Sequence, residues 1–117
     1  MKQLELDAEG IKVRLTIRHA TVKDVMQRGI LAGRAMDTEY RSEAERAVAV
    51  MVYPRCLACT EGIIENNGQV KDVQSLTPEE FCALPYEIGE AWFAAVIEKN
   101  PGWALQPLEE KDSEKKD

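Results

Sequence analysis

The sequence predicts a mostly helical α+β fold. An alternating apolar pattern at the N-terminus, three helix-capping signals and an aromatic stretch that ends at a proline together indicate this class. The chain has 117 residues, 44% hydrophobic and 31% charged, which is ordinary for one globular domain. We assign residues 1–103 to that domain. Residues 104–117, which end in the charge-dense run EEKDSEKKD, are expected to form a disordered tail.

The N-terminal stretch LELDAEGIKVRLTI, residues 4–17, predicts a β-hairpin with one buried face. Apolar and polar residues alternate on both sides of DAEG, whose Asp and Gly suit a turn. The apolar positions expected on the buried face are Leu4, Leu6, Ile11, Val13, Leu15 and Ile17.

A helix over residues 22–35 follows, because Thr21 suits an N-cap and Asp24 stands three residues later. Its apolar stripe, and so its expected core face, consists of Val22, Val25, Met26, Gly29 and Gly33. The two glycines, four residues apart, either let another backbone approach closely or are incidental, and each costs about 1 kcal/mol relative to Ala.

The next helix begins at Ser42, with Glu45 three residues on, and it is expected to be more central than the first. Its predicted stripe consists of Ala44, Ala47, Val48 and Met51, widened by Val50 and Val52. Pro54 leaves two alternatives: the helix ends near Val52, or it kinks and continues through RCLACTEG.

Three further elements are expected after Gly62. Residues 63–73 carry Asn67-Gly68, which favours a small second hairpin, with a plain loop as the alternative. Thr77, Pro78 and Glu80 begin a helix of one or two turns. The last helix follows Pro85 and stops at Asn-Pro-Gly, and its stripe comprises Ile88, Ala91, Trp92, Ala95 and Val96, with Phe93 and Ile97 beside it.

The three cysteines, Cys56, Cys59 and Cys82, are interpreted as buried structural residues. Cys56 and Cys59 form a single CxxC without the second ligand pair typical of zinc sites, and His19 lies far away in sequence. A zinc site and a redox pair remain the alternatives, although a thioredoxin-type CxxC would open a helix after a buried strand.

Composition and motifs disfavour several functional classes. A formal net charge of −6 disfavours nucleic acid as a partner, and the longest apolar stretch, residues 47–53, is too short to span a bilayer. We therefore expect a small acidic cytoplasmic protein. His19 has no neighbouring nucleophile motif and no phosphate-binding glycine loop is present, so we predict a protein that is not an enzyme, with no catalytic, cofactor-binding or metal-binding residue.

Three stretches, IRHATVKDVMQRGILAGRA, AVMVYPRCLACT and EEFCALPYEIGEAWFAAVIEKNPGW, resemble the small tail assembly chaperones encoded beside the tape measure protein in long-tailed bacteriophages and prophages. The similarity covers roughly residues 10–103. It consists of an order of features: a strand region, a T-V-x-D helix, an alanine-rich helix running into VYP, and an aromatic helix ending in NPxW. No functional residue is carried over, because none of these is a catalytic motif.

The resemblance implies a non-catalytic chaperone in the cytoplasm of a bacterial host. Such a protein would bind the apolar, helical tape measure protein, keep it soluble and help to recruit tail tube subunits. We expect an apolar groove between the helix after Thr21 and the helix that begins at Tyr86 to hold a client helix. The alternatives are another small bacterial interaction or regulatory module, or a zinc-binding module that uses Cys56, Cys59 and Cys82.

Overall fold

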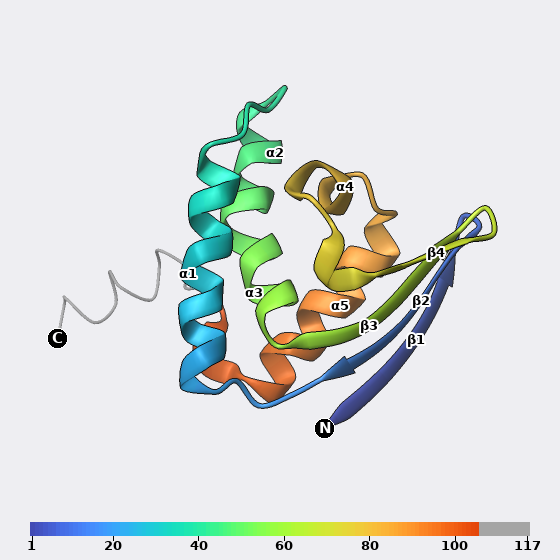
Figure 1. The fold of residues 1–117 in the computed structure, drawn as a ribbon, viewed down its shortest axis with the longest axis horizontal. Helices are drawn as coiled ribbons and strands as arrows, with labels where there is room; N and C mark the ends of the chain where they lie inside the picture. Colours follow the sequence, from blue (N-terminus) through green and yellow to red (C-terminus); the bar gives the residue numbers. More distant parts are fainter. Residues whose placement is uncertain (106–117) are drawn as a thin grey trace, which may run out of the picture.

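A computed structural model describes residues 1–105 and contains a four-stranded antiparallel sheet (Figure 1). The strands, in spatial as well as sequence order, are β1 (Lys2–Ala8), β2 (Ile11–Ile17), β3 (Thr60–Asn66) and β4 (Gln69–Asp72). This confirms the α+β class and the N-terminal hairpin. Residues 106–117, which make up most of the predicted tail, lie outside the described residues.

Both hairpins have two-residue turns with positive φ at each central position. The first turn has Glu9 at φ 54° and Gly10 at 82°, and the second has Asn67 at 54° and Gly68 at 81°. These values belong to type I′ turns, whose twist matches that of the flanking strands. Asn67-Gly68 therefore forms the predicted second hairpin, and the loop alternative is wrong.

The helices are α1 (Val22–Met36), α2 (Glu43–Ala47), the π-helical segment η1 (Val48–Val52), α3 (Tyr53–Ala58), the 3₁₀ turn η2 (Val73–Ser75), α4 (Pro78–Cys82), α5 (Tyr86–Lys99) and the 3₁₀ turn η3 (Pro101–Trp103). The predicted capping boxes of Thr21 with Asp24 and of Thr77 with Glu80 are both formed. Within residues 1–105, no helix combines the length and apolarity needed to cross a bilayer.

Pro54 does not end its helix. The chain remains helical from α2 through η1 into α3, so the second alternative for Pro54 is correct as far as Ala58. It is wrong for the end of RCLACTEG, because residues 60–62 belong to β3. Proline has no N–H and its ring crowds the preceding turn, and the wider π turn absorbs this: the N–H of Tyr53 donates to the carbonyl oxygen of Val48, five residues back. Cys56 is thus helical, and Cys59 is the C-cap of α3.

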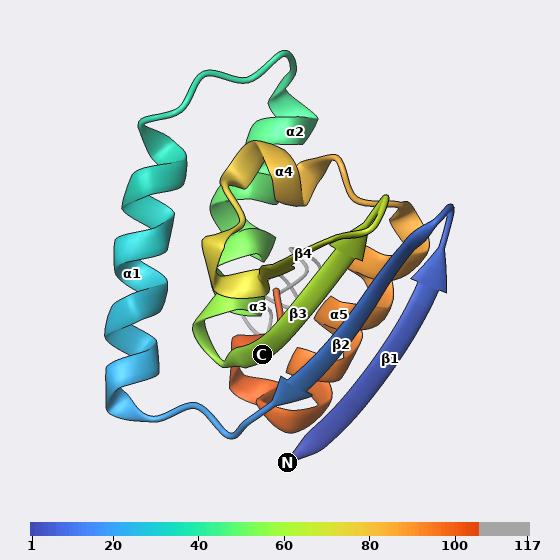
Figure 2. The same ribbon diagram turned by 45° about the vertical axis from the view of Figure 1, so that its right-hand side comes forward.

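The elements are layered, with the sheet at one side and α1 at the other (Figures 1 and 2). Helix α5 packs against β1 and β2, α3 packs against α5, and α1 packs against α3 and η1. The middle of this stack holds edge-to-face aromatic pairs, with ring centroids 5.5 Å apart for Phe81 and Trp92 and 5.7 Å apart for Tyr53 and Phe81. We name the continuous helical segment from α2 through η1 to α3, residues 43–58, the α2–α3 rod. The core therefore lies between the sheet and this rod.

The burial of α5 confirms its predicted stripe, but the predicted stripes of the two earlier helices are wrong. In α1 the buried residues are Asp24, Leu31 and Ala35, whereas all five residues of the predicted stripe are exposed. Likewise Ala44, Ala47, Val48 and Met51 are exposed, and the rod is central only from Ala49 and Tyr53 onward. The reason is positional, because α1 and α2 lie at the edge of the stack, where only one side of a helix meets the core.

Candidate interaction surface

The orientation of α1 is fixed at its first turn by Asp24. Its carboxylate accepts from the Thr21 N–H at 3.0 Å and from Arg18 Nη1 at 2.7 Å, and the residue is 4% exposed. Burial by itself would raise the pKa of Asp24, but the Thr21 N–H and the Arg18 guanidinium stabilise the carboxylate more, so the pKa lies below its ordinary value. Because Asp24 points inward to the end of β2, the positions half a turn away point outward.

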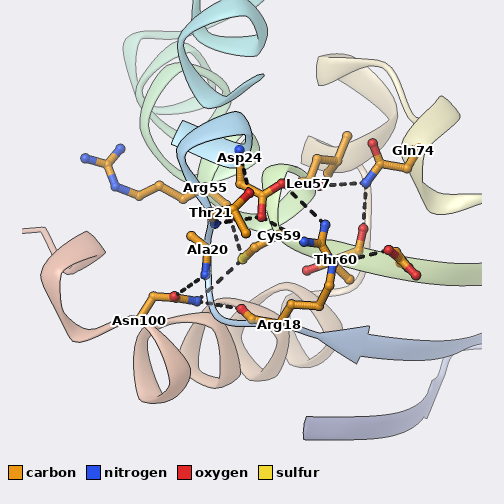
Figure 3. Close-up of polar contacts among 11 residues, drawn as sticks. Arg18, Ala20, Thr21, Asp24, Arg55, Leu57, Cys59, Thr60, Gln74 and Asn100 are labelled. Atoms are coloured by element: carbon orange, nitrogen blue, oxygen red, sulfur yellow. Dashed lines mark hydrogen bonds and ion pairs between the residues drawn. The ribbon is translucent and has the colours of Figure 1, made fainter. Parts of the chain in front are cut away.

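A second set of hydrogen bonds ties α5 to the loop that enters α1 (Figure 3). The Asn100 side-chain oxygen accepts from the Ala20 N–H at 2.8 Å, and its amide nitrogen donates to the Arg18 carbonyl oxygen at 3.0 Å. Nearby, Trp92 Nε1 donates to Thr60 Oγ1 at 3.0 Å. These polar groups satisfy one another inside the fold, and we interpret the cluster as structural.

The outward side of α1, which we name the outer face, is formed by Val22, Val25, Met26, Gly29, Ile30, Gly33 and Met36. The exposed fractions are 82% for Val22, 65% for Met26 and 58% for Ile30. At 100° per residue, these positions lie within one broad sector of the helix, opposite Asp24, Leu31 and Ala35. Single exposed apolar residues are ordinary, but a contiguous stripe along a helix is typical of a binding surface.

The two glycines of the outer face have free space above them. A Cβ added at Gly29 or Gly33 would meet no atom of the described chain within 4 Å, so nothing there requires glycine for packing. Each glycine costs about 1 kcal/mol relative to alanine in a helix. Paired small residues four apart let a second helix approach closely, and among residues 1–105 no such helix occupies the position.

The two edges of the outer face differ in charge. Lys23 and Arg34 lie on the edge next to Ile30, and both are exposed, while the acidic Asp24 is buried on the opposite side. The other edge ends at Met36, which shares a depression with Ala47, Val50 and Met51 and with the exposed Glu43 and Arg46, so that border carries one charge of each sign. The surface is therefore an apolar stripe with one cationic border, on a chain whose net charge is −6.

The predicted groove between α1 and α5 is not formed, because α3 packs against both helices and separates them. The outer face of α1 is on the far side of α3 from α5. The sequence predicted a cleft between two helices as the binding surface. The exposed apolar surface of the structure is instead one face of α1.

The structure does not bring the three cysteines together as a metal site. Among residues 1–105, no group of three or more His, Cys, Asp or Glu side chains has the proximity needed to hold a metal ion. Cys56 and Cys59 are buried, and the Cys82 thiol donates to the Glu45 carbonyl oxygen at 3.6 Å. Burial raises the pKa of Cys59 to about 11 and that of Cys56 well above its ordinary value, so both remain protonated at neutral pH.

No protein-family model matches the chain, and neither a curated protein nor a solved structure shows significant similarity to it.

Sequence reasoning identified five of the seven residues of the outer face, all except Ile30 and Met36, but placed them in the core. Helix α1 has two apolar sides, one with valines, methionines and glycines and a narrower one with Leu31 and Ala35. The pattern favours burial of the larger side. A signal that points the other way is Asp24, since the carboxylate of a capping box that also meets Arg18 must lie toward the end of the preceding strand.

Proposed function

We propose that this protein is a non-catalytic tail assembly chaperone whose outer face binds an apolar helix of a tape measure protein. One observation carries the proposal: the most apolar side of α1 is exposed and has two open glycines at its centre. Its support is the fit between that surface and the resemblance described above, in which the client is long, apolar and helical. Binding would hide the apolar face of the client and lower the concentration of its aggregating form.

Charge favours a different protein, rather than a second copy, as the occupant. In an antiparallel pair of α1 helices from two copies, the edges that carry Lys23 and Arg34 would lie side by side and repel. A client helix with small and apolar residues on one side and Asp or Glu along one edge would neutralise them. The acidic character of the remaining chain would then help to keep the complex in solution.

The test is to express the chain together with the genes that flank its own and to measure how much of the co-expressed client stays soluble and co-elutes. The proposal predicts a long helical client in one of these genes, held in solution by the wild-type protein. The variant Met26→Glu, which places a carboxylate on the outer face, should release the client into the pellet. The matched control is Val70→Glu on β4, because Val70 is 57% exposed and belongs to another element.

Two results would overturn the proposal. One is that Met26→Glu and Val70→Glu retain the client equally well, which would show that the outer face is not used. The other is that no flanking gene encodes an aggregating helical protein, in which case the tape measure client is wrong. Circular dichroism of both variants distinguishes loss of binding from loss of fold.

A further inference from the structure

A second apolar site lies on the other side of the α2–α3 rod from α1. The inference drawn from it does not depend on the proposed function. It is a pocket of about 280 Å³ between the rod and the α4–α5 corner. Its lining is mostly apolar and includes Val48, Phe81, Cys82, Tyr86, Gly89 and Glu90. A volume of this size suits one or two side chains better than a cofactor, since sites for small molecules usually enclose about 300–1,000 Å³.

The floor and the rim of the pocket differ in chemistry. Phe81 at the floor is 4% exposed, whereas Val48 and Tyr86 at the rim are 38% and 71% exposed. Glu90 lines the pocket and accepts from the Tyr86 hydroxyl at 2.9 Å, and Glu87 is exposed in the same first turns of α5. Among the residues that the structure describes, no lysine or arginine lines the pocket. The pocket is therefore an apolar hole with an acidic border, the opposite charge pattern from the outer face of α1.

We propose that this pocket binds an aliphatic or aromatic anchor side chain of a protein partner in which Lys or Arg flank the anchor. The reason is complementarity: the apolar floor takes the anchor out of water, and the carboxylates at the rim favour cationic neighbours and disfavour acidic ones. A second copy would have to offer an exposed apolar residue next to a lysine, and Val22 beside Lys23 is such a pair, so self-association is a measured outcome of the test.

Gly89 is the position for a variant that we expect to fill the pocket while the chain stays folded. It lies in the pocket wall within α5, and a Cβ added there would meet no atom within 4 Å. Gly89→Leu therefore puts a leucine into the pocket and also removes a glycine from a helix interior, which favours folding. Its matched control is Gly33→Leu, which makes the same replacement at an equally open helical glycine on the outer face of α1.

The experiment is selection of a random dodecapeptide library against the wild-type protein, with counter-selection against Gly89→Leu. The expected result is a set of peptides that share Leu, Ile, Phe or Trp with Lys or Arg within a few residues. For a fluorescent copy of one such peptide, we expect Gly89→Leu to weaken binding at least tenfold and Gly33→Leu to leave it unchanged. Raising the salt from 50 to 500 mM should weaken it several-fold, because exposed charges are screened.

Cys82 gives an independent readout, because its thiol lies in the pocket wall while Cys56 and Cys59 are fully buried. Bound peptide should slow the alkylation of Cys82 by N-ethylmaleimide, and mass spectrometry measures the rate of that alkylation. Recovery of acidic or motif-free peptides, or equal binding to wild type and Gly89→Leu, would overturn the proposal. So would concentration-dependent dimerisation that Gly89→Leu abolishes, since the occupant would then be a second copy. None of these results depends on whether Met26→Glu releases a tail client.

Discussion

Helices α1 and α5 have nearly the same length, 15 and 14 residues, and both have a clear apolar side, yet they use it in opposite ways. In α5 that side is buried, with Ile88, Trp92 and Val96 fully inaccessible. In α1 the larger apolar side is exposed. The difference follows from position, because α5 packs against both the sheet and α3, whereas α1 packs mainly against α3 and η1, with a further contact where Arg28 lies over the Trp103 ring. An apolar stripe thus indicates that a helix can pack against another apolar surface. The position of the helix in the layered fold determines whether the same chain provides that surface.

The largest expected loss of stability comes from a substitution on the buried side of α5. Trp92→Ala should lower the free energy of unfolding by about 4 kcal/mol, because it leaves a cavity of aromatic size beside Phe81. Urea unfolding followed by circular dichroism measures this loss. The control Trp92→Phe, which mainly leaves the Thr60 hydroxyl without its partner, should cost about 1–3 kcal/mol. Equal losses in the two variants would show that packing of the ring contributes little.

The second largest loss of stability is expected from a substitution on the inward side of α1. Leu31 is 1% exposed, and Leu31→Ala should cost about 3 kcal/mol in the same urea experiment. A loss below about 1 kcal/mol, the range of surface substitutions, would mean that α1 is held only loosely on α3.

The ion pair that orients α1 should have a smaller and pH-dependent effect. Asp24→Asn should cost about 2 kcal/mol near pH 7, because it removes charge-assisted hydrogen bonds from Arg18 and Thr21. The folded-state pKa of Asp24 is below its ordinary value of 3.8, so this stability is present above that pH and is lost as the pH falls through the folded pKa.

The measurement is the difference in unfolding free energy between wild type and Asp24→Asn from pH 7 to pH 2.5. It should stay constant down to about pH 4 and shrink below it. Contributions that the two proteins share, such as that of Glu80, cancel in this difference. The control Asp7→Asn, at an exposed position of β1, should change stability little at any of these pH values.

The smallest expected effect on stability comes from a substitution on the exposed side of α1, and it separates the two sides of that helix most directly. Ile30 is the neighbour of Leu31 but is 58% exposed, so Ile30→Ala should change the unfolding free energy by no more than about 0.5 kcal/mol. If the outer face binds a client, the same variant should weaken that complex about tenfold, or about 1.4 kcal/mol. Calorimetric titration with the co-purified client measures this, and a variant that loses stability but keeps its client would contradict the proposed role.

The sequence predicted the local structure of this protein well, because caps and turns depend on residues a few positions apart. Thr21 with Asp24, Thr77 with Glu80, and Asn67-Gly68 each formed the element that their chemistry favours. The alternating strands needed no more than their own period and the turn at Glu9-Gly10. For Pro54, two outcomes remained, and packing of Tyr53 and Leu57 in the core selected the continuous helix.

Only the tertiary structure decided which apolar residues are inside. Five residues of the outer face were predicted from the sequence as a stripe, but a stripe at helical spacing looks the same whether it meets the core or water. Likewise the α4–α5 pocket combines residues from Val48 to Phe93 that share no local pattern. Burial is a property of the whole stack of layers, since it depends on what lies on each side of a helix, and spacing along one helix does not contain that information.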